Sequence, residues 1–98
     1  MPVLPRQAGG GAADDAMSQW FVYMVRASDD SLYTGITTDL ARRLAEHQAG
    51  KAGAKYFRGR SAMAMVYSEI ANGRSDASIR EAAIKKLSRR QKLELIGN

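Results

Sequence analysis

The amino-acid sequence predicts an α+β fold, in which helices flank a small three-stranded antiparallel sheet in the order β-β-α-β-α-α. Two short runs rich in aromatic and β-branched residues, 20–25 and 32–36, are separated by a turn and predict a hairpin. A third run, 64–70, has the alternation of a strand. Helical spacing and capping signals predict helices over residues 38–48, 75–87 and 89–96.

The hairpin is predicted to turn at residues 29–31, where two aspartates and a serine favour a turn. Such a hairpin brings Tyr23 and Tyr33, from adjacent strands, toward one side of the sheet. Aromatic cross-strand pairs are common stabilisers of sheets, so this pair alone does not define a site. Gly35 lies in the second strand, where a glycine often marks close approach by another backbone or by a ligand.

The first helix follows, with Thr38 predicted as its N-cap and Asp39 as an acid in its first turn. At about 100° per residue, Arg43 and His47 fall on the flank of the apolar stripe, whereas Arg42 points away from it. A cation beside a buried stripe needs an anionic partner or a ligand. The alternative is an arginine that extends along the edge of the core to reach water.

Residues 51–62 have no period and are predicted to form a loop before the third strand. That strand is expected to present three side chains to one face, namely Met65, Tyr67 and Glu69. Ser75 is predicted to cap the second helix. Ser88 and Gln91 have the spacing of a capping box, which predicts a break and a last helix.

Cysteine is absent from the 98 residues, which excludes disulfides, thiolate nucleophiles and cysteine-ligated zinc. His47 is the single histidine, so a metal site must use carboxylates, phosphate oxygens and water. No stretch approaches the roughly 20 apolar residues that span a bilayer, and the N-terminus lacks the basic segment and apolar core of a signal peptide. We therefore expect a soluble cytoplasmic protein with no membrane partner.

The chain is long enough for one domain, which we place at residues 19–98. Residues 1–18 lack the apolar content to order themselves and are predicted to be a flexible tail, within which Met17 is an alternative start. The formal net charge of +5 divides into −1 for this tail and +6 for the domain. Such a domain suits a polyanionic partner, although a solvated basic surface is an equal alternative.

Cations and aromatic residues are interleaved in the predicted loop, at Lys51, Lys55, Tyr56, Phe57, Arg58 and Arg60. This composition is typical of contacts to backbone phosphates and of stacking on exposed bases. The alternative is a basic loop whose aromatic side chains pack into the core, and we expect this of at least one of Tyr56 and Phe57. A second basic cluster is interpreted as a solvated face with a secondary electrostatic role, and it comprises Arg80, Lys85, Lys86, Arg89, Arg90 and Lys92.

An ordered set of motifs runs through the first half of the domain, namely Phe21-Val22-Tyr23, Tyr33-Thr34-Gly35, and Arg43 followed by His47. The later segments 53–59 and 80–88 continue the set. It resembles the signature of the GIY-YIG nucleases, and residues 19–96 are similar to their small single-domain YhbQ-like subgroup. The chain departs from the name-giving motif at Phe21, in place of glycine, and at Thr34, in place of isoleucine.

The resemblance implies a GIY-YIG-like fold and a site that hydrolyses a phosphodiester bond with one divalent ion, Mg²⁺ or Mn²⁺. It implies that Tyr23 activates or orients water and that Tyr33 holds the network around the phosphate. Arg43 would stabilise charge on the phosphoryl oxygens, His47 would assist the network, and Glu81 would bind the metal. A free phenol has a pKa of about 10, so Tyr23 needs a nearby cation to act as a base at neutral pH.

Glu81 is the candidate metal ligand on the resemblance alone. Lys85 lies four residues on, so the alternative is an exposed helical ion pair worth about 0.2–0.5 kcal/mol. Only the resemblance prefers Glu81 to Glu69. A single carboxylate suffices for Mg²⁺, which commonly completes its coordination with water and substrate oxygens.

The leading hypothesis is a metal-dependent endonuclease that hydrolyses phosphodiester bonds in DNA, with dependence on DNA structure as one form of it. Nucleic-acid contacts are expected from Gly35 and from the loop residues Lys55, Tyr56, Arg58 and Arg60. The main alternative is a non-catalytic module of the same fold that binds DNA or RNA, and a third is a scaffold with an idle site. DNA is favoured over RNA, and no obligate protein partner is evident.

Overall fold

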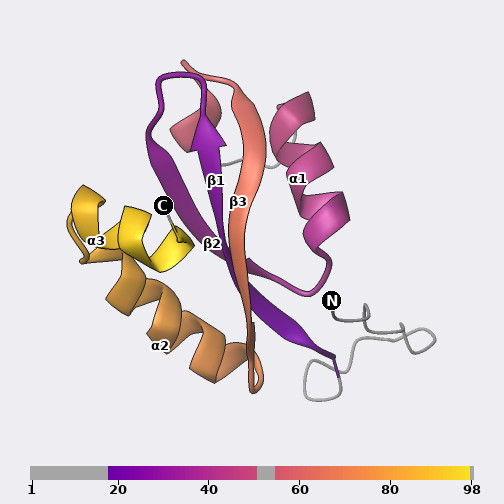
Figure 1. Ribbon diagram of the computed structural model, residues 1–98. Coiled ribbons are helices and arrows are strands. Elements are labelled where there is room, and N and C mark those ends of the chain that lie inside the picture. The colour runs from indigo at the N-terminus through magenta and orange to yellow at the C-terminus, as the bar shows by residue number, and fades with distance from the viewer. Residues whose placement is uncertain (1–17, 51–54, 98) are drawn as a thin grey trace.

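The computed structural model describes residues 18–50 and 55–97 and confirms the predicted order of elements (Figure 1). They are β1 (Trp20–Ala27), β2 (Leu32–Thr37), α1 (Leu40–Ala49), the 3₁₀ turn η1 (Lys55–Phe57), β3 (Ala62–Ala71), α2 (Arg74–Lys85) and α3 (Arg89–Ile96). The strands form one antiparallel sheet in the order β2-β1-β3. The predicted tail lies outside the described residues apart from Ser18, and so does Lys51 of the predicted loop.

Helices cover both faces of the sheet, with α1 on one side and α2 and α3 on the other (Figure 1). Two groups of buried side chains follow from this arrangement, because successive residues of β1 point to opposite faces. Val22 and Met24 pack with Ile84 beneath α2 and α3. Tyr23 and Val25 face α1 instead, where Leu40 and Leu44 cover them. The central strand is therefore buried on both faces, which explains its continuous apolar sequence.

The predicted hairpin of β1 and β2 is confirmed, with Tyr23 opposite Gly35 and Val25 opposite Tyr33. Its turn is held by the Asp29 carboxylate, which accepts hydrogen bonds from the backbone amide (3.0 Å) and the hydroxyl (2.5 Å) of Ser31. Asp30 takes the left-handed backbone conformation, with φ of 69°, that aspartate tolerates better than most residues. The turn residues thus fix the register that brings Gly35 beside Tyr23.

The third strand is longer than predicted and does not keep the predicted alternation. Met24 of β1 pairs with Tyr67, whereas the next residue, Val25, pairs with Met65, so β3 carries an extra residue at this point. This is the pattern of a β-bulge, which reverses the facing of the side chains that follow it. Met65 therefore packs against the α1 side and Tyr67 against the α2 side, and the expectation that they share a face is wrong.

The helix ends follow local capping chemistry, with two corrections. Asp39, not Thr38, is the N-cap of α1, and its carboxylate accepts from the Arg42 amide at 3.0 Å. Ser75 does not cap α2, because the helix begins one residue earlier and its N-cap residue is Gly73. The predicted capping box of Ser88 and Gln91 is present at the start of α3, with both of its hydrogen bonds.

Candidate functional site

A buried tyrosine lies at the centre of the predicted cluster. Tyr23 projects from β1 toward α1 and has no exposed surface. Its hydroxyl oxygen lies 2.8 Å from Nε2 of His47 and accepts a hydrogen bond from Nε of Arg43 at 3.4 Å. Both partners come from α1, where Arg43 and His47 lie one turn apart on the side facing the sheet. Arg43 and His47 thus lie on the side of α1 that the sequence predicted, and their contacts with the Tyr23 hydroxyl connect α1 to the sheet.

Gly35 makes room for this phenol. A Cβ atom at position 35 would lie 2.5 Å from Oη of Tyr23 and 2.7 Å from its Cζ. Real Cβ contacts essentially never fall below 3.0 Å, so any side chain here would force the ring to move. The close approach at this glycine is therefore made by a side chain, that of Tyr23 on the neighbouring strand, and not by the backbone that was one of the two expected partners.

Burial and neighbouring charges set the protonation states in this cluster. Burial raises the pKa of Tyr23, and the hydrogen bond from Arg43 opposes this only in part. The same burial, aided by the charge of Arg43, lowers the pKa of His47. Its hydrogen bond to Tyr23 raises the pKa of Arg43, against the effect of its partial burial. At neutral pH the cluster therefore holds a neutral phenol, a neutral imidazole and a guanidinium cation.

The tautomer of the neutral imidazole decides the direction of the hydrogen bond between His47 and Tyr23. When Nε2 of His47 is the acceptor, the Tyr23 hydroxyl donates to it and the imidazole carries its proton on Nδ1. Nδ1 is buried and has no hydrogen-bond partner among the described residues. Glu46, which the sequence reasoning missed, pairs with Nη1 of Arg43 at 3.1 Å and holds the guanidinium beside the phenol.

Aromatic rings form one wall of the site. Tyr33 packs against His47, with ring centroids 5.2 Å apart, and against both aromatic residues of η1, Tyr56 (5.1 Å) and Phe57 (5.3 Å). Phe57 also covers the imidazole of His47 at 4.8 Å. The expectation that at least one of the two loop aromatics is core is confirmed for Phe57, which packs against the buried cluster that contains Tyr23.

The cations predicted for the loop differ in what they do. Arg60 pairs with Asp29 at 2.9 Å, donates to the Tyr56 carbonyl at 3.0 Å, and places its guanidinium 4.3 Å from the Tyr56 ring centroid. It therefore ties η1 to the β1–β2 turn. Lys55 and Arg58, which flank the aromatic residues of η1, are exposed.

Glu81 comes from α2, with its side chain 22% exposed and 3.2 Å from the Lys85 ammonium. Its charge is the smallest of the influences that raise the pKa of Tyr23, after burial and the charge of Tyr33. Across residues 18–50 and 55–97, no group of three or more His, Cys, Asp or Glu side chains could hold a metal ion. Glu81 would thus act as a lone carboxylate.

The alternative carboxylate, Glu69, is already engaged. Arg80 binds it through two nitrogens, at 2.7 and 3.2 Å, and the Tyr67 hydroxyl donates to it. Although partial burial opposes the change, these hydrogen bonds lower the pKa of Glu69. The cluster lies on the α2 side of the sheet, away from Tyr23. Glu69 is therefore occupied by Arg80 and Tyr67, whereas Glu81 is paired only with Lys85 among the contacts of the described residues.

The fold and the tyrosine cluster define the class of the protein. Residues 19–94 match the family model described as the GIY-YIG catalytic domain, and the chain belongs to the GIY-YIG family. It is 51% identical over 80 residues to a UPF0213 protein of Cronobacter sakazakii, a match that covers 82% of this chain and 83% of that one. It is 46% identical over 80 residues to the UPF0213 protein YhbQ of Escherichia coli, covering 82% and 79%.

Two solved structures share the fold. One is the NMR structure of EF2693 from E. faecalis, with a TM-score of 0.55, 39% sequence identity and coverage of 84% of this chain and 86% of that one. The other is the UPF0213 protein BH0048 from Bacillus halodurans, with a TM-score of 0.50, 41% identity and coverage of 80% and 82%. The predicted α+β fold of GIY-YIG type is therefore confirmed.

Proposed function

We propose that this protein is a metal-dependent endonuclease that hydrolyses phosphodiester bonds in DNA, with a preference set by DNA structure. The observation that carries the proposal is the Tyr23 hydroxyl, buried between Arg43 and His47 and packed over Gly35. A phenol placed between a cation and a proton acceptor is equipped to gain and lose a proton. Membership of the GIY-YIG family supports the same class of reaction.

In the proposed reaction, Tyr23 is the general base for the attacking water. Its pKa is raised by burial, so it cannot act as a free phenolate at neutral pH. His47 would act as the proton acceptor, because its neutral Nε2 can take the phenolic proton as Tyr23 takes one from water. Arg43 favours the phenolate character that develops at the oxygen. Water, Tyr23 and His47 thus form a path for one proton.

Charge develops on the phosphate as water attacks, and the protein must neutralise it. Arg43 is the group proposed to do so, since its guanidinium carries a fixed charge at the phenol and is held by Glu46. Tyr33 is proposed to position the phosphate through its hydroxyl, as its ring is fixed by His47 and η1. Lys55, Tyr56 and Arg58 would contact the strand beyond the scissile phosphate.

Glu81 fits a Mg²⁺ or Mn²⁺ ion only as one ligand of a site that water and substrate oxygens complete. Mg²⁺ accepts such a site, since it commonly binds through one or two carboxylates together with phosphates. When bound, the ion would polarise the phosphoryl group and stabilise the leaving oxygen. Lys85 is the cation that Glu81 would exchange for the metal.

A module that binds DNA or RNA without cleaving it is the second candidate. The full burial of Tyr23 and its raised pKa are the observations that favour it, because a neutral phenol with no exposed surface is poorly placed to take a proton from water. DNA remains the preferred partner in both proposals, and cytoplasmic location stays a prediction. No helix in the described ranges has the length and apolar character to cross a membrane.

The test is cleavage of labelled DNA and RNA structures with Mg²⁺ or Mn²⁺, comparing each site variant with a matched control. Tyr23→Phe pairs with Tyr67→Phe, Arg43→Ala with its neighbour Arg42→Ala, and Glu81→Gln with Glu94→Gln. Each site variant should lose at least about 100-fold in rate, the effect expected for a general base or a charge-stabilising donor. The controls should cut within about twofold of the unmodified protein.

Two results would count against the nuclease. One is a folded Tyr23→Phe variant that cuts as fast as the unmodified protein. The other is binding to the panel without cleavage under either metal, with the three site variants binding equally well. The second result would establish the binding module in its place.

A further inference from the structure

A concentrated positive charge lies where α2 ends and α3 begins. Residues 82–93 contain five cations and no acidic residue. We call this surface the basic corner, and it consists of Lys85, Lys86, Arg89, Arg90 and Lys92. It spans the last residue of α2, its C-cap and the first turn of α3.

Ion pairs offset only part of this charge. Lys85 pairs with Glu81, and Arg90 lies 3.9 Å from Glu94 in a pair whose side chains are both mostly exposed. An exposed pair of this kind contributes little and is screened by salt. Arg89 donates to the Asp30 carbonyl at 2.7 Å, a neutral acceptor that orients the guanidinium without cancelling its charge. The corner therefore keeps a net positive charge with a defined orientation.

Lys85 and Lys86 suit the C-terminal end of α2, but the position of Arg89 and Arg90 is unfavourable for α3. A helix N-terminus carries partial positive charge, so cations in the first turn are destabilising and acids are preferred there. The first turn of α3 holds Arg89 and Arg90 and no acid. The capping box of Ser88 and Gln91 is what begins the helix instead. Arg89 and Arg90 therefore do not stabilise α3 through its dipole, and an external anion would be favoured by both the dipole and these side chains.

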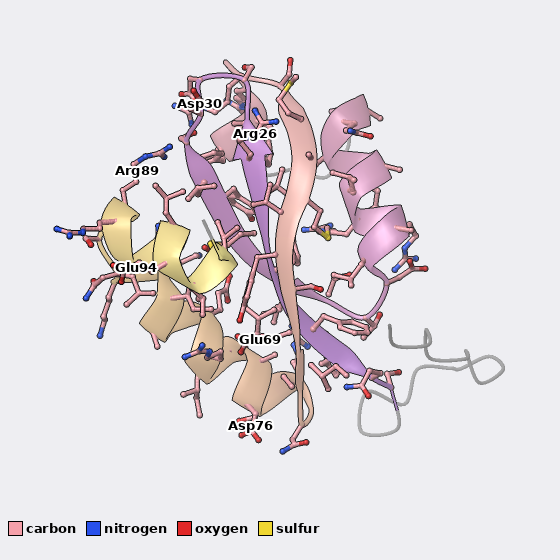
Figure 2. The ribbon with its side chains drawn as sticks, in the orientation of Figure 1. Arg26, Asp30, Glu69, Asp76, Arg89 and Glu94 are labelled. Atoms are coloured by element: carbon pink, nitrogen blue, oxygen red, sulfur yellow. The ribbon has the colours of Figure 1, made fainter. Side chains whose placement is uncertain are left out.

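Contacts connect the corner to the candidate site. Arg89 reaches from the start of α3 to Asp30 at the β1–β2 turn (Figure 2). The preceding residue of that turn, Asp29, pairs with Arg60, which stacks on the Tyr56 ring at the aromatic wall. The two acids of the turn are themselves paired, Asp29 with Arg60 and Asp30 with Arg26 at 3.6 Å. The turn thus separates two basic surfaces without presenting unpaired acid between them.

We propose that the basic corner binds the sugar-phosphate backbone of the nucleic acid that is cut at the Tyr23 site, on a segment away from the scissile bond. This rests on the proposed function for the identity of the substrate. A membrane surface fits less well, because interfacial binding needs apolar side chains to insert beside the cations. The exposed large apolar residues of the described chain are Met63, Ile70 and Ile79, which lie on β3 and within α2.

The test compares two double variants that remove the same charge. Lys86→Gln with Arg90→Gln neutralises the corner, and Arg42→Gln with Arg74→Gln neutralises two exposed arginines elsewhere. Binding of a labelled DNA duplex is measured by fluorescence anisotropy over a series of NaCl concentrations, with EDTA present so that nothing is cut. Circular dichroism confirms that both variants fold.

Each phosphate contact contributes about 0.9 to the slope of log K against log salt for duplex DNA. Loss of two contacts should lower the slope by about 1.8 and weaken binding at about 0.1 M salt by up to about 60-fold. The control variant should change the slope by less than about 0.5. A corner variant that matches the control overturns the proposal, as does a corner that binds anionic lipid vesicles but contributes nothing to DNA binding. Because DNA binding is measured without metal, the experiment tests the basic corner even if the protein does not cleave DNA.

Discussion

The contact between Gly35 and Tyr23 predicts a large effect from one added methyl group. In Gly35→Ala the new Cβ would lie 2.5 Å from Oη of Tyr23, so the ring must retreat by about 0.9 Å to reach ordinary contact. Tyr23 is fully buried, and its movement would break the 2.8 Å contact with His47. Overpacking of this kind costs about 1–3 kcal/mol. For a domain of this size that corresponds to a drop in Tm of roughly 4–8 °C per kcal/mol.

The same displacement should act on catalysis. A misplacement of about 1 Å at a reacting group costs on the order of 100-fold in rate. The measurement is Tm together with the cleavage rate of Gly35→Ala, set against Gly59→Ala as the matched control. A Cβ at Gly59 meets no atom within 4 Å, so that variant should keep both its stability and its activity. Full activity and an unchanged Tm in Gly35→Ala would refute the requirement for a glycine beneath the phenol.

Two further predictions concern buried polar groups. Thr34→Val should raise the free energy of unfolding by about 1 kcal/mol, because the Thr34 hydroxyl is buried without a partner among the described residues. Thr37→Val is the control and should lower the free energy of unfolding, since the Thr37 hydroxyl accepts a hydrogen bond from the Asp39 amide at 3.1 Å. Denaturant titration measures both variants. Stability should also fall as pH drops below about 6.5, because the lowered pKa of His47 lets the unfolded chain bind a proton that the folded chain does not. His47→Asn should flatten that part of the pH profile, and a profile unchanged by this substitution would contradict the burial of a neutral imidazole.

The features predicted well from the sequence are those that depend on neighbours in the chain. The capping box of Ser88 and Gln91 lies within one helical turn, so its spacing is sufficient to find it. The placement of Arg43 and His47 follows from helix geometry alone, and the structure has both on the sheet side of α1. The hairpin also follows from local signals, since its turn is short and its strands are adjacent.

The features that were missed depend on partners far away in the sequence. The bulge opposite Met24 and Val25 arises only when β3 pairs with β1, and nothing in the strand's own sequence marks it. The ion pair of Arg60 with Asp29, 31 residues earlier, could not be predicted from the composition of the loop, and the nucleic-acid contact expected of Arg60 stays a prediction. The sequence alone also does not show that Arg80 engages Glu69. In each case the feature depends on contacts between residues that are distant in the sequence and meet only in the folded protein.

The chemistry of the proposed site follows from a conflict between burial and charge. Burial raises the pKa of Tyr23, which opposes its use as a base. The same burial lowers the pKa of His47 and keeps its imidazole neutral, and in the tautomer with the proton on Nδ1 the lone pair of Nε2 can relieve Tyr23 of its proton. Arg43 cannot fill that role, because a guanidinium has no acceptor, but it stabilises the charge that remains on the oxygen. One buried cluster therefore supplies the acceptor and the counter-charge together, and neither Arg43 nor His47 alone would make the phenol a base.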